Sequence, residues 1–194
     1  MEFKALKAEM RKVRLSARDA ISVDDRITKS LVMADLAADD IAIEPGEIVS
    51  GFFPIRSEAD IRPLMHRLKR RGARLCVPAI IDKQTIVFRE VEDGIPLVDT
   101  GFGTSGPGVD AAELDPDLML VPLSAFDRRG HRIGYGAGYY DRAITRLRDK
   151  GRVPRLIGVA FDCQEVDAVP EEPHDVALDA VLTESGLRAF GKEY

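Results

Sequence analysis

The chain has 194 residues, enough to bury a sizeable core, and we expect residues 1–194 to form a single domain. Hydrophobic residues make up 45% and charged residues 31%, and the formal net charge is -5, so the composition does not favour nucleic acid as a partner. No apolar run approaches the roughly eighteen residues that a membrane span needs, and the N-terminus, with its alternating charged and apolar residues, is not a signal peptide.

The first helix is indicated by apolar residues at helical spacing, at Phe3, Leu6, Met10 and Val13. Basic residues recur in the same way on an adjacent face, at Lys7, Arg11, Arg14 and Arg18. In most proteins such a basic face is solvated. Ser22 then resembles the N-cap of a second helix, although an aspartate stands where a capping box has Glu or Gln. We expect that helix to bury Ile27, Leu31 and Ala34.

Strand-length apolar runs follow at 48–54, 73–81 and 85–91. Between the first two runs, a third helix is predicted to end at Gly72; its apolar positions are Ile61, Leu64, Met65 and Leu68. Residues 93–117 are rich in Gly, Pro, Asp and Thr and predict a surface loop.

The run at 117–123 is continuously apolar, which predicts a strand buried on both faces. A glycine-rich loop follows, and then a helix with Tyr140, Ile144 and Leu147 that ends at Gly151. The last strands are expected at 155–161 and 179–183. Because strands alternate with helices, we predict an α/β domain of Rossmann-like three-layer form, with a mostly parallel sheet and helices on both faces.

The two cysteines, Cys76 and Cys163, lie far apart in apolar runs, as is typical of small core residues in a reducing compartment. We therefore expect a cytoplasmic protein. No long apolar helix stripe is left over once the sheet is covered, so we also expect a monomer. His66, His131 and His174 show no metal-ligand spacing, and we assign none of them a catalytic role.

The loop from Ser124 to Gly138 leaves the carboxyl end of a predicted strand and leads into a helix, and ligands bind at such ends in open α/β sheets. Free N–H groups at a helix N-terminus favour an anion, and glycines let the backbone approach it closely. Three arginines add positive charge upstream, at Arg128, Arg129 and Arg132. Together these features indicate a phosphate site.

Taken alone, the glycine pattern also fits a tight structural turn. It lacks the Lys-Ser/Thr of a Walker A loop, and Tyr139 stands where a dinucleotide fingerprint needs glycine. Asp141 in the first helical turn could simply complement the helix dipole, or it could hold Mg²⁺ against phosphates.

The whole stretch from Val121 to Arg142 resembles the signature of the 5-formyltetrahydrofolate cyclo-ligase (methenyltetrahydrofolate synthetase) family. The matching positions are Pro122, Phe126, Asp127, Gly130, Arg132, Gly134, Gly136, Gly138, Tyr139, Tyr140 and Asp141. Further matches, spread over nearly all of the chain, are Lys7, Arg11, Ser22, Phe53, Glu58 and Asp179.

The resemblance implies an enzyme that uses ATP and Mg²⁺ to convert 5-formyltetrahydrofolate into 5,10-methenyltetrahydrofolate. In the reaction it implies, the formyl oxygen attacks the γ-phosphate, a second folate nitrogen closes the ring and expels phosphate, and ADP and phosphate leave. Phosphoryl transfer of this kind depends mainly on positioning and charge neutralisation. The acidic tail of a polyglutamated folate would be attracted by surface Lys and Arg.

The resemblance also implies roles for individual residues. The ATP-binding residues would be Lys7, Arg11, Arg132, Ile133, Gly134, Tyr135, Gly136, Ala137, Gly138, Tyr139 and Tyr140. The folate-binding residues would be Phe53, Glu58, Tyr135, Gly136, Ala137, Gly138 and Tyr139. Asp141 and Asp179 would hold Mg²⁺, and the catalytic residues would be Arg132, Tyr139 and Asp141.

Ordinary structural roles remain open for several of these residues: Glu58 as a helix N-terminal acid, Phe53 as core and Asp179 as a turn residue. Two other functions also remain open. One is an enzyme acting on a sugar phosphate or CoA ester, with a catalytic carboxylate or base at the pocket and no need for ATP. The other is a module whose basic first helix binds RNA or a partner, which the net charge of -5 and the lack of an aromatic-plus-basic stripe count against.

Overall fold

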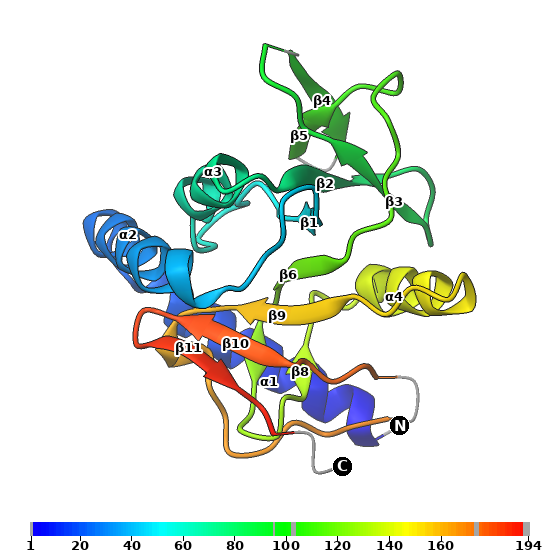
Figure 1. Cartoon of the computed structure of the whole chain (residues 1–194). Helices are drawn as coiled ribbons and strands as arrows, with labels where there is room; N and C mark the ends of the chain where they lie inside the picture. Colours follow the sequence, from blue (N-terminus) through cyan, green and yellow to red (C-terminus); the bar gives the residue numbers. More distant parts are fainter. Residues whose placement is uncertain (1, 95, 102–103, 173–174, 192–194) are drawn as a thin grey trace.

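A computed structural model describes residues 2–94, 96–101, 104–172 and 175–191. Its centre is a seven-stranded sheet of order β11-β10-β9-β6-β1-β2-β3 (Figure 1). The parallel strands are β1 (Ile48–Ser50), β2 (Arg74–Ile80), β6 (Leu118–Pro122), β9 (Arg155–Val159) and β10 (Ala180–Thr183). The edge strands β3 (Ile86–Glu90) and β11 (Gly186–Ala189) run antiparallel to their neighbours. The predicted α/β class with a mostly parallel sheet is confirmed.

Helices cover both faces of this sheet, as predicted. Helices α2 (Val23–Asp40) and α3 (Arg62–Arg70) pack on one face, and α4 (Tyr139–Asp149) packs on the other. Strand β6 shows the alternation. Leu118 and Leu120 join the core under α2 and α3, whereas Met119 and Val121 join the core under α4, and all four are fully buried.

The local signals at helix ends are confirmed. The hydroxyl of Ser22 accepts a hydrogen bond from the Asp25 N–H at 3.1 Å and caps α2. Helix α3 is followed by Gly72 with φ of 100° and α4 by Gly151 with φ of 77°, conformations that favour glycine. Cys76 is buried in the core, and burial raises the pKa of its thiol to about 12, so it is a structural residue.

Several short strands were not predicted. The expected loop at 93–117 contains the antiparallel pair β4 (Leu97–Gly101) and β5 (Thr104–Pro107), and the glycine-rich loop contains the pair β7 (Ala125–Phe126) and β8 (Arg132–Ile133). The prediction that 179–183 is the last strand was wrong, because β11 follows it. The strand expected at 48–54 ends at Ser50, where the chain leaves the sheet for an irregular segment.

The N-terminal helix α1 (Glu2–Asp19) faces the opposite way from the usual amphipathic helix. Its apolar residues Phe3, Leu6 and Val13 are exposed by 57%, 45% and 45%, while Arg18 on its basic face is only 2% exposed. It packs against β7 and the short 3-10 helix η1 (Asp162–Gln164), below the sheet in Figure 1. The solvation that is usual for such a basic face therefore does not hold at Arg18.

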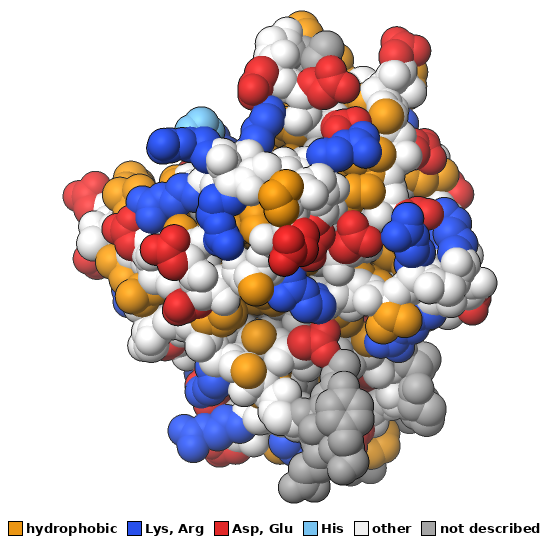
Figure 2. Space-filling model, viewed as in Figure 1, with side chains coloured by type: hydrophobic (Ala, Val, Ile, Leu, Met, Phe, Trp, Pro, Cys, Tyr) orange, Lys and Arg blue, Asp and Glu red, His pale blue; other side chains and the backbone are white. Residues whose placement is uncertain are grey.

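Helix α2 also departs from the predicted pattern. Ala34 is buried, but Ile27 and Leu31 are exposed, because the buried side of the helix is made by Ser30, Met33, Ala34, Ala37 and Ala38. Figure 2 shows hydrophobic side chains at the surface over α2, on the left, and acidic and basic side chains mixed over the rest of this face. None of the helices in the described ranges combines the length and apolarity that a membrane span requires.

Candidate functional site

The glycine loop lies at the carboxyl end of β6 and leads into α4, as the sequence predicted. Gly136 and Gly138 have φ angles of 101° and 66°, which side-chain-bearing residues rarely adopt. Within the described chain, the N–H groups of residues 134–138 donate to no protein acceptor. A row of unused backbone donors beside a helix N-terminus suits an anionic ligand.

A cavity of about 480 Å³, which we call the polar cavity, lies between this loop and α1. Lys7 and Arg11 enter it from α1, and Arg132 enters it from β8. The Arg11 Nε donates to the carbonyl of Gly134 at 2.8 Å, and burial lowers the pKa of Arg11. The structure therefore brings together the three cations that the resemblance assigns to ATP, although they lie far apart in the sequence.

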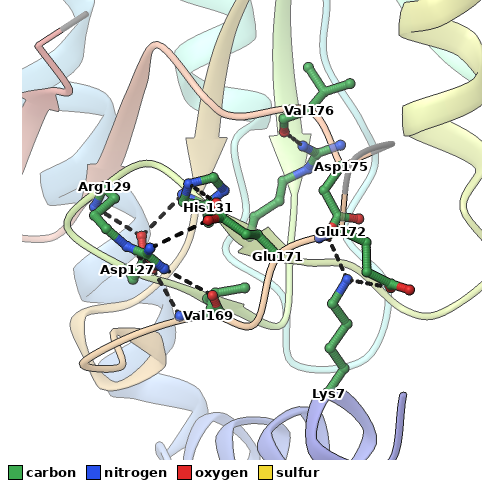
Figure 3. Close-up of polar contacts among 10 residues, drawn as sticks. Lys7, Asp127, Arg129, His131, Val169, Glu171, Glu172, Asp175 and Val176 are labelled. Carbon is green, nitrogen blue, oxygen red and sulfur yellow. Dashed lines mark hydrogen bonds and ion pairs between the residues drawn. The ribbon is translucent and has the colours of Figure 1, made fainter. Parts of the chain in front are cut away.

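Two of these three cations, Lys7 and Arg132, form ion pairs with carboxylates. The Lys7 Nζ lies 2.9 Å from Glu172 and 2.5 Å from Asp175 (Figure 3). Burial opposes the charged form of Lys7, but the hydrogen bonds and charges of these two acids outweigh it and raise its pKa. Arg132 pairs with Asp141 at 2.8 Å and also donates to the carbonyl of Val176.

These acids belong to a segment that flanks the polar cavity and that we call the acidic strap, residues 169–172 and 175–176. At its start, the N–H of Val169 donates to the buried carboxylate of Asp127 at 2.8 Å, and Glu171 lies 2.6 Å from the Nε2 of His131 (Figure 3). Asp127 also accepts from Arg129 and from the His131 N–H. The strap is thus fixed to the glycine loop at one end and to Lys7 and Arg132 at the other.

Two of the expected upstream cations do not reach the cavity. Arg128 pairs with Glu165 at 2.9 Å and Arg129 with Asp127 at 2.8 Å. Burial alone would raise the pKa of Asp127, but the hydrogen bonds that it accepts outweigh burial and lower its pKa. Arg129 and Asp127 therefore hold the strap instead of a ligand.

Glu172 and Asp175 were missed by sequence reasoning, although the acidic run before β10 was a signal. Asp179, which was expected to hold metal with Asp141, lies at the opposite edge of the sheet. Its carboxylate accepts from the Leu156 N–H at 2.7 Å, at the amino ends of β9 and β10, whereas the glycine loop follows the carboxyl end of β6. The structure does not bring Asp179 to Asp141, and it places Asp175 beside the polar cavity instead.

The described residues contain no group of three or more His, Cys, Asp or Glu side chains that could form a metal cage. Magnesium does not need such a cage, because it usually takes one or two carboxylates and completes its shell with water and phosphate oxygens. Asp141 and Asp175, both lining the polar cavity, fit this pattern. His66 was assigned no role; His131 binds the strap, and His174 lies outside the described residues.

A second cavity, of about 170 Å³, lies on the other side of the glycine loop, and we call it the apolar cavity. Its lining includes Pro78, Ile80, Ile86, Pro122, Tyr139 and Tyr140. The hydroxyl oxygen of Tyr140 is buried and has no hydrogen-bond partner within the described ranges, and burial raises its pKa. An apolar slot with an unused polar atom suits a flat ring system that carries a few polar groups.

Two of the residues expected to bind folate, Phe53 and Glu58, are set back from this cavity. Phe53 packs against the core, and neither Phe53 nor Glu58 lines the apolar cavity. Glu58 is buried, and its Oε2 accepts from the Ile55 N–H at 2.9 Å. Burial raises the pKa of Glu58, and a hydrogen bond from Tyr135 offsets part of this rise. Tyr135 lines the apolar cavity, so Glu58 is connected to this cavity through its hydrogen bond with Tyr135.

Comparison with known proteins identifies the family of this chain. The profile of the 5-formyltetrahydrofolate cyclo-ligase family matches residues 3–184. The 5-formyltetrahydrofolate cyclo-ligase of Escherichia coli (strain K12) is 32% identical over 143 residues, which covers 71% of this chain and 78% of that protein. That of Haemophilus influenzae is 26% identical over 185 residues, with coverage of 91% and 95%.

Solved structures show the same fold. The 5,10-methenyltetrahydrofolate synthetase of Aquifex aeolicus has a TM-score of 0.75 at 27% identity, covering 97% of this chain and 95% of that one. The Mycoplasma pneumoniae synthetase has a TM-score of 0.74 at 23% identity, covering 92% and 98%. Since the family profile spans nearly the whole chain, this protein belongs to the 5-formyltetrahydrofolate cyclo-ligase family of enzymes.

Proposed function

We propose that this enzyme converts 5-formyltetrahydrofolate into 5,10-methenyltetrahydrofolate with ATP, using the polar cavity for the nucleotide phosphates and the apolar cavity for the folate ring. The observation that carries the proposal is that one glycine loop forms a wall of both cavities. Such an arrangement lets a phosphoryl group on one side meet a folate oxygen on the other, which is what the reaction requires.

On the nucleotide side, the backbone N–H groups of residues 134–138 would donate to phosphate oxygens, and Lys7, Arg11 and Arg132 would neutralise their charge. These cations have positions fixed by α1 and β8, so little ordering is needed when ATP binds. Charge neutralisation at fixed positions is the main contribution a protein makes to phosphoryl transfer.

Asp141 and Asp175 would hold Mg²⁺, which supplies positive charge to the triphosphate when bound. Asp141 pairs with Arg132 and Asp175 pairs with Lys7. Each acid would have to release this side-chain cation to hold the metal. Asp179 is not part of this proposal, because it binds the Leu156 N–H at the far edge of the sheet.

On the folate side, Tyr139 and Tyr140 would enclose the ring system, and Tyr140 would offer its unused hydroxyl. The formyl oxygen attacks the γ-phosphorus and displaces ADP, and the second folate nitrogen then attacks the formyl carbon and expels phosphate. An apolar enclosure keeps water from the phosphorylated intermediate, which water would otherwise hydrolyse.

The test is to mix the protein with 5-formyltetrahydrofolate and Mg²⁺, with and without ATP, and to follow the absorbance of the methenyl product. We expect product only with ATP. Product without ATP would contradict the nucleotide role of the polar cavity, and no product under any condition would refute the proposed function.

Asp141→Asn tests the metal assignment. We expect turnover to fall on the order of a hundredfold or more, because an amide lacks the negative charge that attracts Mg²⁺, while the fold survives. The matched control is Asp149→Asn in the last turn of the same helix, which is exposed and outside both cavities. Equal turnover in the two variants would show that Asp141 holds no metal.

A further inference from the structure

A buried guanidinium in the last turn of α1 has no role in the site described so far. Arg18 is 2% exposed, and its Nε lies 2.9 Å from the hydroxyl of Ser57. Its Nη1 lies 2.5 Å from the hydroxyl of Tyr135, and its guanidinium carbon is 5.7 Å from the centre of the Tyr135 ring. A buried charge is costly, and here its hydrogen bonds go to two neutral hydroxyls.

These two hydroxyls come from segments that lie far apart in the sequence. Tyr135 belongs to the glycine loop and lines the apolar cavity. Ser57 precedes Glu58 in the segment between β1 and α3, and its own hydroxyl donates to Asp19 of α1. Arg18 therefore joins the glycine loop to the segment that carries Glu58, and it does so from a third element of the fold.

The direction of the Tyr135 proton follows from this contact. A phenol hydroxyl carries one proton, and Arg18 can only donate, so the Tyr135 oxygen accepts from Arg18 and its proton is free to point at Glu58. A hydrogen bond from Tyr135 to Glu58 agrees with this direction. The resulting chain runs from Arg18 through Tyr135 to Glu58, and such chains strengthen one another in a buried setting.

We propose that Arg18 is a positioning residue for the folate substrate: by holding the hydroxyls of Tyr135 and Ser57 together, it fixes the Tyr135 wall of the apolar cavity. The inference rests on the proposed function, because it assumes that this cavity takes folate. A planar guanidinium reaches two acceptors at once, which a single ammonium on a flexible stem does not reproduce. Arg18→Lys should thus lose the effect despite keeping the charge.

The experiment compares Arg18→Lys with Arg14→Lys in the methenyl assay. Arg14 lies one turn earlier on the same helix, and its Nη1 donates to the carbonyl of Cys163 at 3.1 Å, outside both cavities. For Arg18→Lys we expect the KM for 5-formyltetrahydrofolate to rise about tenfold, with the KM for ATP within about twofold of the wild type. For Arg14→Lys we expect neither constant to change.

Tyr135→Phe provides a second route to the same answer, because it removes one hydroxyl from a ring that is 37% exposed and leaves the buried charge in place. We expect a similar rise in the folate KM. The double variant should be no worse than either single variant, because Arg18 acts through Tyr135. Urea unfolding of each variant checks that the fold survives. If Arg18→Lys does not fold, the folate KM of Tyr135→Phe tests the proposal by itself.

Three results would overturn the inference: a folate KM in Tyr135→Phe equal to that of the wild type, an equal folate KM in Arg18→Lys and Arg14→Lys, or single effects that multiply in the double variant. Each of them leaves the proposed function standing, because the wild type still forms product. Failure of the wild type to form methenyl product with ATP refutes the proposed function instead, so the two failures are distinguishable.

Discussion

Helices α1 and α4 border the same glycine loop but bury opposite kinds of side chain. Helix α4 packs Ala143, Ile144 and Leu147 against the sheet, as an amphipathic helix normally does. Helix α1 exposes its apolar Phe3 and Leu6 and turns its basic face inward. The difference shows that core burial orients α4, whereas polar contacts at the site orient α1.

Helices α1 and α4 should also differ in how much each contributes to the free energy of unfolding. Burial of apolar surface is the dominant favourable contribution to folding, so α4 should contribute strongly to the free energy of unfolding. The inward face of α1 is held by hydrogen bonds and ion pairs, which contribute less net free energy because water competes for the same groups. Helix α1 should therefore matter more for ligand binding than for stability.

The largest expected effect comes from truncating the buried face of α4. Ile144→Ala should lower the free energy of unfolding by about 2–5 kcal/mol, because Ile144 is fully buried and its removal leaves a cavity. Leu6→Ala on α1 is the matched control and should change stability by less than about 0.5 kcal/mol, since Leu6 is 45% exposed. Urea unfolding measures both. Similar losses in the two variants would contradict the contrast between the helices.

An intermediate effect is expected at Lys7, where α1 meets the polar cavity. Lys7→Gln should raise the KM for ATP about 10–100-fold, because a charged donor to phosphate is lost, while the folate KM changes little. Lys12→Gln on the exposed side of α1 is the control and should leave the KM for ATP unchanged. A normal KM for ATP in Lys7→Gln would place the phosphates elsewhere.

The smallest effect concerns Glu58, whose charged form is favoured by Arg18 of α1 and whose charge helps to raise the pKa of Tyr140 of α4. Burial raises the pKa of Glu58 in the folded state, so its ionised form costs stability at neutral pH, and this cost is relieved as the pH falls through the raised pKa. Glu58→Gln should therefore stabilise the fold at neutral pH by about 0.5–1 kcal/mol. The gain should shrink as the pH is lowered toward the ordinary pKa of a glutamate.

Asp60 provides a control of opposite sign. Arg62 holds the pKa of Asp60 below its usual value, so Asp60 stabilises the fold at neutral pH and loses that contribution as the pH falls. Asp60→Asn should thus be destabilising at neutral pH. Urea midpoints measured between neutral and acidic pH test both signs, and a Glu58→Gln variant less stable than the wild type at neutral pH would contradict the assignment.

The sequence predicted those parts of the fold that local signals determine. The continuous apolar run of β6, the Ser22 cap and the glycines after α3 and α4 each act within a few residues, and all were confirmed. The β4–β5 pair was missed because its strands pair only with each other and carry no core-facing alternation. Its loop-like composition was the stronger local signal.

Parts of the site were harder to predict because they depend on how distant segments meet. Nothing in the sequence distinguishes Arg18 from Arg14, since both lie on one basic face and only the fold brings Ser57 and Tyr135 to one of them. Asp175 and Asp179 both precede β10, and only the fold decides which of them meets Lys7. An amphipathic pattern likewise predicts which face of a helix is buried only where packing against the hydrophobic core orients that helix, as it does for α4 but not for α1.

The acidic strap affects which form of a nucleotide would bind better. Glu172 and Asp175 hold Lys7, so under the proposed function they would compete with phosphate for it, and part of the binding free energy of a nucleotide would be spent on displacing them. A carboxylate freed from Lys7 next to a triphosphate would be repelled by it, unless a divalent cation arrives with the nucleotide and bridges the two. Under the proposed function, charge balance would therefore make magnesium-loaded ATP a better ligand than bare ATP.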